Sequence, residues 1–202
     1  MFGLPKSTEM SRQLPKKAVY EKFNMNTAAK EKFDADISRI TIVSEISTAT
    51  TSIAKGKNVT AIYILLVSLK NKSFNERTIM SLSNLIGQNI LFVLEYDGEQ
   101  KLAVYHSSFI SGEWKKPDEL NITLKGLDFD TVWENIIKDI GGIVVSEGNT
   151  LEEQIVVNEE AEKLKKEIAR LEKLAWAEKQ PKKKFELANQ AKSIKARLDA
   201  LI

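Results

Sequence analysis

Residues 158–202 read NEEAEKLKKEIARLEKLAWAEKQPKKKFELANQAKSIKARLDALI and are the most strongly patterned part of the chain. Apolar residues recur there at alternating spacings of three and four, the a/d pattern of a helix that packs along one stripe. The two series are Ala161, Leu164, Ile168, Leu171 and Ala175, then Leu187, Ala191, Ile194, Leu198 and Leu201. Pro181 lies between them, and a helix begins at a proline more readily than it continues through one. We therefore predict two helices with a break near 178–184.

Each predicted helix is too short to form a free coiled coil, so the two stripes must be covered. They can pair with each other as a coiled-coil-like hairpin or with another chain. A hairpin has one narrow seam and leaves Leu174, Trp176 and Phe185 outside it. We hypothesise that these three residues bind a protein partner or a second copy, together with the seam residues Leu164, Ile168, Leu171, Ile194 and Leu198. Trp176 is the leading anchor, because tryptophan is enriched among residues that dominate interfaces. Packing against the rest of the same chain is the alternative.

Composition restricts the classes of function. The chain has 202 residues, 43% of them hydrophobic and 29% charged, which suits a folded domain with an appendage. It has no cysteine and one histidine, His106, so disulfides, thiolate sites and multi-histidine metal sites are excluded. We expect no cofactor. The opening MFGLPKSTEM lacks the apolar region of a signal peptide, and the longest apolar run, 61–67, is far shorter than a membrane span, so a cytoplasmic location is expected.

Positive charge gathers at the two ends of the chain. Residues 1–57 carry ten Lys/Arg and six Asp/Glu, and residues 158–202 carry twelve and eight, so the centre is acidic. Near the ends, basic residues alternate with aromatic ones, as in nucleic-acid-binding surfaces. The residues concerned are Arg12, Lys16, Lys17, Lys182, Lys183 and Lys184. This pattern predicts either weak, non-specific nucleic-acid contact or solvated helix ends.

The preceding residues predict an α+β domain over 1–150, followed by the hairpin over 151–202. Apolar alternation or apolar runs give about four or five strands in a mixed or antiparallel sheet, at 38–46, 59–69, 89–96, 101–109 and 122–127. Helices that cover the sheet are predicted within 14–34, from a Ser73–Glu76 capping box to Gly87, and over 129–140. Asp97-Gly98 is a two-residue turn pair that joins two of the strands. Residues 1–13 are expected to form an extended arm.

One group of residues has the form of a catalytic site. Asp97, Glu99 and Lys101 have the acid and Glu-x-Lys arrangement of a restriction-like nuclease, in which acids hold Mg²⁺ and the lysine polarises water. Here the three straddle a turn, which holds geometry poorly. Charged residues are also common at an exposed hairpin tip. His106 lies in a predicted strand with no evident nucleophile beside it.

Three segments resemble a known family: FGLPKSTEM…LPKKAVYEKF, NILFVLEYDGEQKLAVYHS, and EIARLEKLAWAEKQPKKKFELANQAKSIKARL. Together they resemble an uncharacterised bacterial family defined by a domain of unknown function. The resemblance implies genes beside helicase and DNA methyltransferase genes in restriction-type defence loci. It implies an accessory role near DNA-modifying enzymes and supplies no catalytic residues.

Our leading interpretation is therefore a non-enzymatic accessory or adaptor subunit that associates with a DNA-modifying or defence complex through its C-terminal hairpin. The alternatives are a Mg²⁺-dependent restriction-like nuclease at Asp97, Glu99 and Lys101, or a weak, non-specific DNA-binding module that uses the basic ends.

Overall fold

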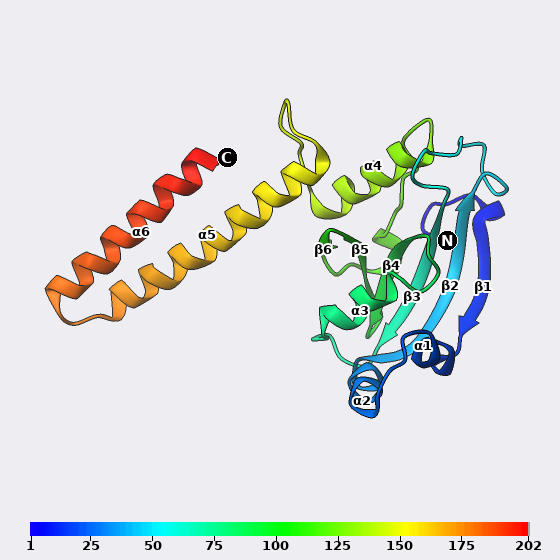
Figure 1. Ribbon diagram of the computed structural model, residues 1–202, viewed down its shortest axis with the longest axis horizontal. Helices are drawn as coiled ribbons and strands as arrows, with labels where there is room; N and C mark the ends of the chain where they lie inside the picture. The colour runs from blue at the N-terminus through cyan, green and yellow to red at the C-terminus, as the bar shows by residue number, and fades with distance from the viewer. Residues whose placement is uncertain (202) are drawn as a thin grey trace. The chain divides into compact units, whose positions relative to one another are not determined.

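The structure, a computed structural model, describes residues 1–201 and forms two compact units, Met1–Ile143 and Val144–Ile202. We call them the sheet unit and the hairpin unit. The sheet unit carries a six-stranded sheet and its covering helices, and the hairpin unit consists mainly of two long helices (Figure 1). The predicted α+β class with a C-terminal helical hairpin is confirmed. Within residues 1–201, no helix is both long and apolar enough to cross a membrane.

The strands follow one another across the sheet in the order of the sequence. They are β1 Glu9–Leu14, β2 Ile37–Ser47, β3 Ala61–Leu69, β4 Asn89–Tyr96, β5 Glu99–His106 and β6 Ser108–Ser111. Neighbours pair antiparallel except β3 and β4, which are parallel and are joined through a helix. The sheet is therefore mixed, with six strands rather than the four or five expected.

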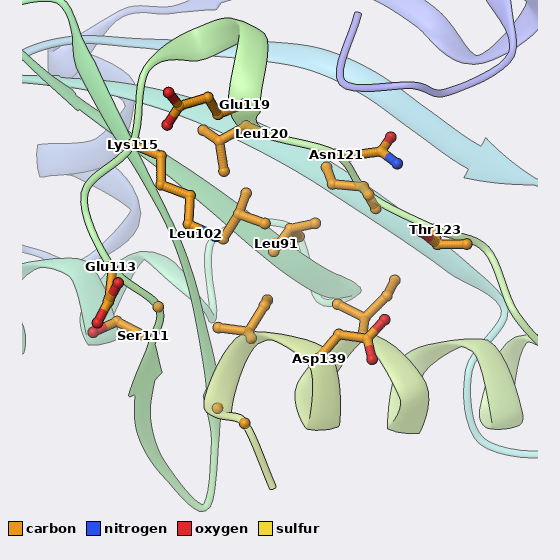
Figure 2. A pocket seen from close by; sticks show the side chains of 16 residues that line it. Leu91, Leu102, Ser111, Glu113, Lys115, Glu119, Leu120, Asn121, Thr123 and Asp139 are labelled. Atoms are coloured by element: carbon orange, nitrogen blue, oxygen red, sulfur yellow. The ribbon is translucent and has the colours of Figure 1, made fainter.

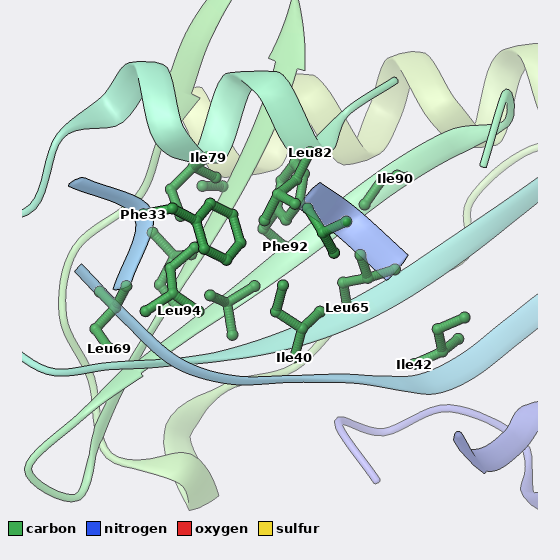
Figure 3. Packing of buried hydrophobic residues seen from close by; sticks show 14 residues of the cluster. Phe33, Ile40, Ile42, Leu65, Leu69, Ile79, Leu82, Ile90, Phe92 and Leu94 are labelled. Carbon is green, nitrogen blue, oxygen red and sulfur yellow. The ribbon is translucent and has the colours of Figure 1, made fainter. Parts of the chain in front are cut away.

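Helices on one face of the sheet bury a large apolar cluster. The helical segments of this unit are η1 Lys6–Thr8, α1 Lys16–Lys22, α2 Thr27–Asp36, α3 Glu76–Leu82, η2 Pro117–Glu119 and α4 Phe129–Gly141. Val19 of α1, Phe33 of α2 and Ile79 of α3 join sheet residues such as Leu65 and Phe92 in this cluster (Figure 3). All five side chains are at most 1% exposed, so their burial is a main source of stability.

The opposite face is buried as well, which explains the continuous apolar run at 61–67. Residues that alternate along a strand point to opposite faces. Leu65 belongs to the cluster under α1–α3, whereas its neighbour Ile64 is also fully buried. The helix α4 contacts β3, β5 and β6. Asp128 caps its start, where the Asp128 side chain accepts a hydrogen bond from the Thr131 amide at 2.8 Å, and Gly142, with φ +59°, caps its end.

Three of the predicted segments were wrong in the sheet unit. Residues 122–127 form no strand, because the Ile122 amide donates to the Phe2 carbonyl at 3.0 Å instead of to a strand neighbour. The expected extended arm contains η1 and the edge strand β1. The strand predicted over 101–109 is two strands, since Ser107 adopts φ +54° and turns the chain between β5 and β6.

The predicted start of α3 was also wrong. Asn75, not Ser73, caps this helix and accepts a hydrogen bond from the Arg77 amide at 3.0 Å. Asp36 fixes the start from outside the helix, because one of its carboxylate oxygens accepts from the Asn75 amide at 3.2 Å and from the Thr78 hydroxyl at 3.1 Å. The helix ends at Leu82, earlier than the predicted Gly87.

The hairpin unit contains α5 Leu151–Ala177 and α6 Pro181–Leu201, which pack against each other. A capping box starts α5: Glu153 N–H donates to the Thr150 hydroxyl at 3.2 Å, and Thr150 N–H donates to the Glu153 carboxylate at 2.8 Å. The predicted break is confirmed, with Pro181 as the first residue of α6. Along the seam, the buried residues are Ala161, Leu171, Ala175, Ala191 and Leu198.

Candidate partner-binding site on the helical hairpin

Three large apolar side chains near the turn between α5 and α6 are exposed, in addition to Val144 and Val156 at the start of the hairpin unit. Trp176 is 86% exposed, Phe185 68% and Leu174 44%. Leu174 and Trp176 are two positions apart on α5, so they point about 200° apart around the helix. The seam lies between them, which places the two side chains on opposite sides of the hairpin. Trp176 therefore exposes an aromatic surface on one side of the hairpin.

A hollow of about 340 Å³ lies beside Trp176. We call it the Trp176 groove, and both helices line it, with Glu172, Ala175, Trp176, Lys184, Ala188, Ala191, Lys192 and Lys195. Three of the lining residues are alanines, whose small side chains leave the hollow between the helices. Three lysines bring positive charge to it. The groove thus combines an apolar floor, an aromatic wall and basic groups.

Helical spacing explains why these residues meet. On α6, Ala188, Lys192 and Lys195 follow one another at intervals of three or four, so they share one side of that helix. The Lys184 ammonium lies 5.9 Å from the centre of the Trp176 ring, which connects the two helices near the turn. Such a cation–π contact at an exposed site is worth about 0.5–1 kcal/mol.

Some of the other charges of the hairpin form local pairs. Arg170 binds the Glu167 carboxylate at 2.7 Å and holds its pKa below the ordinary value. At the turn, backbone amides, first that of Gln180, lower the pKa of Glu178. Exposed pairs of this kind contribute little to stability, so the seam holds the hairpin together.

The predicted nucleic-acid-binding residues fall in both units. Lys182, Lys183 and Lys184 form the exposed first turn of α6. Arg12 is exposed on β1, and Lys17 is exposed beside Glu21. Lys16 differs, because its ammonium binds the Asp34 carboxylate at 2.7 Å and the Ile37 carbonyl. Its charge serves the packing of α1 on α2, which leaves the N-terminal cluster with less free charge than the sequence indicates.

The residues of the nuclease alternative lie on the hairpin between β4 and β5. Asp97 and Gly98 form the turn with φ values of +48° and +78°. Glu99 is ion-paired with Lys72, and the Lys101 ammonium lies 5.8 Å from the Trp114 ring centre. Across the described residues 1–201, no group of three or more His, Asp or Glu side chains is placed to hold a metal ion. Nuclease activity stays a prediction.

A second hollow, of about 500 Å³, lies in the sheet unit (Figure 2). Its apolar lining comes from the sheet, from α4 and from the segment after η2, with Leu91, Leu102, Leu120, Ile122, Ile136 and Ile140. Glu113, Lys115, Glu119 and Asp139 are also among its lining residues. Asp139 is already paired with Lys125 at 3.3 Å. The lining is therefore apolar between the sheet and α4, with charged residues among those that border it.

Sequence reasoning missed a carboxylate that organises a loop of the sheet unit. Asp130 accepts hydrogen bonds from the amides of Lys57, Asn58 and Val59 at 2.8, 3.0 and 2.6 Å. These bonds, first that from Val59, hold its pKa below the ordinary value. A Cβ added at Gly56 would lie 2.4 Å from the Asp130 carboxylate. The loop is therefore built around this anion, a long-range contact with no local signal in the sequence.

Comparison with known proteins identifies a family rather than an activity. The family model described as "Domain of unknown function (DUF4391)" matches residues 2–198 and so includes both units. No curated protein and no solved structure matches the chain.

Proposed function

Since the chain belongs to the DUF4391 family, a family without an assigned activity, we propose a function from its geometry: the protein is a non-enzymatic adaptor or accessory subunit. Its hairpin unit docks on a partner protein or on a second copy. Trp176 carries the proposal, because an 86% exposed tryptophan on a packed helix is an unused apolar surface. Burying a side chain of this size contributes about 1.5–3 kcal/mol.

The site around Trp176 supports binding rather than catalysis. The Trp176 groove brings together alanines, lysines and an aromatic ring, with Glu172 as the carboxylate among its described lining residues. Interfaces rely on such aromatic anchors at the edge of small hollows. The partner is proposed to belong to a DNA-modifying or defence complex. This part of the proposal rests on the family resemblance and its implied gene neighbourhood.

The test compares two variants of the full-length protein. Trp176→Ala with Phe185→Ala removes the two exposed aromatic side chains of the hairpin. Leu127→Ala is the matched control, because Leu127 is 90% exposed but lies in the sheet unit. Proteins that co-purify from the native host are identified. The complex of each one with the chain is then reconstituted from purified components, and its Kd is measured. Light scattering measures self-association.

We expect the double variant to weaken one reconstituted complex, or the homodimer, by about 30-fold or more, the effect of losing at least one dominant contact. The Leu127→Ala protein should bind as the unaltered chain does. A complex that forms equally well with both variants would refute docking through the hairpin. So would a monomeric chain that yields no reconstituted complex.

A further inference from the structure

The Trp176 groove has a charge that selects its occupant. Lys184, Lys192 and Lys195 line it, whereas Glu172 is the one carboxylate among the described lining residues. None of the three lysines has an ion pair among those described within residues 1–201. Charges that are not paired within the chain are available to a partner. The complementary surface is acidic.

The shape of the groove selects a helix. Ala175, Ala188 and Ala191 give it a floor of small side chains. Helices approach most closely where the facing side chains are small, at interaxial distances near 8 Å. A third helix laid along α5 and α6 would place an apolar row over the alanines and against Trp176. Two helices with a narrow seam would then become a three-helix bundle.

The same lining disfavours a nucleic acid as the occupant. Its exposed surface is mainly apolar, which offers little to a phosphate backbone. Nucleic-acid-binding surfaces instead follow the phosphate backbone with an extended track of positive charge. A protein helix with one apolar and one acidic side matches both the alanines and Trp176 and the three lysines of the groove.

We infer that the Trp176 groove binds an acidic amphipathic helix of the partner protein. Its apolar row packs on Trp176 and the alanines, and its Asp and Glu residues pair with Lys184, Lys192 and Lys195. The inference rests on the proposed adaptor function and adds the chemistry of the partner.

Three synthetic probes test it with the full-length protein. The first is a labelled amphipathic helical peptide with leucines on one side and glutamates on the other. The second carries glutamine in place of every glutamate, and the third is a labelled single-stranded oligonucleotide. Fluorescence anisotropy measures the Kd of each at low and high salt. Lys192→Glu with Lys195→Glu reverses the charge of the groove. Lys163→Glu with Lys173→Glu is the control, because both lysines are exposed on α5 outside the groove.

We expect the acidic peptide to bind at least tenfold more tightly than the glutamine peptide and to weaken at high salt. The groove reversal should abolish that preference, and the control reversal should leave most of it. Equal binding of the two peptides, or equal effects of the two reversals, would overturn the inference. Oligonucleotide binding that depends on Lys192 and Lys195, without acidic-peptide binding, would overturn it as well.

The adaptor function is separable from this inference. A reconstituted partner that is lost with Trp176→Ala and Phe185→Ala, but is unaffected by reversal of Lys192 and Lys195, would keep the adaptor function and refute the acidic helix.

Discussion

Replacing Leu171 by alanine should selectively destabilise the hairpin unit. Leu171 is 4% exposed in the seam between α5 and α6. Removing a buried leucine side chain costs about 2–5 kcal/mol, and sites that can collapse lie at the lower end. Two helices without a third layer can shift toward each other, so we expect a loss of about 2–3 kcal/mol. Leu174→Ala is the control, since Leu174 is 44% exposed and leaves no closed cavity; its cost should stay below about 1 kcal/mol.

Hydrogen exchange followed by mass spectrometry, peptide by peptide, measures this loss of stability in the hairpin unit. Local opening free energies set the exchange rates of protected amides, and about 1.4 kcal/mol corresponds to a tenfold change. Amides of α5 and α6 should exchange roughly 30- to 150-fold faster in the Leu171→Ala protein. Amides of β3 and β4 should keep their rates. An equal effect of Leu174→Ala, or an equal loss of protection in the sheet, would refute the reasoning.

Four further predictions concern the sheet unit. Gly56→Ala should lower the free energy of unfolding by about 1–3 kcal/mol in urea titrations, because the new Cβ would collide with Asp130; an unchanged midpoint would contradict this. Burial, then the hydrogen bond to Asp34, raises the pKa of Tyr20 to about 12, so its contribution to stability should be complete below pH 10 and lost between pH 10 and 12. The free energy of unfolding of the Tyr20→Phe protein should not show this loss between pH 10 and 12. If the loss persists in that variant, Tyr20 is not its cause. A chain that ends at residue 157 should keep the circular dichroism and cooperative melting of the sheet unit but lose the partner; an unfolded product would make the hairpin part of the core. Glu99→Ala and Lys101→Ala should leave fold and function intact, and a divalent-metal-dependent cleavage activity lost in either variant would revive the nuclease alternative.

Local chemistry made much of the fold predictable from sequence. Asp97-Gly98 adopts positive φ at both turn positions, and Pro181 begins α6 as its missing amide allows. Helical periodicity alone predicted the seam, in which Ala161, Leu171, Ala175, Ala191 and Leu198 are buried and Leu164, Ile168, Leu187, Ile194 and Leu201 are half-buried. The same periodicity placed Leu174, Trp176 and Phe185 outside the seam, and all three are exposed.

Long-range contacts explain what was missed. The strand β1 exists because it pairs with β2 across a bulge, and its own residues alternate only weakly. The alternation at 122–127 is real in the sequence, but Gly126 adopts φ +147° and Leu127 is 90% exposed. The sequence did not indicate a role for Lys192 and Lys195, because they share a hollow with Trp176 only through the packing of α5 on α6.

The strand order of the sheet has a consequence for how the chain acquires its structure. Each strand pairs with the one before it, but only β4–β5–β6 are joined by tight turns. The β1–β2 connection, residues 15–36, carries α1 and α2, and the parallel pair β3–β4 is joined through residues 70–88, which carry α3. Closing either connection costs more chain entropy than forming a tight turn. We therefore expect the central strands, which depend on these long connections, to pair in the rate-limiting step of folding, with destabilising substitutions in Phe92 or Ile79 slowing refolding more than those in β6.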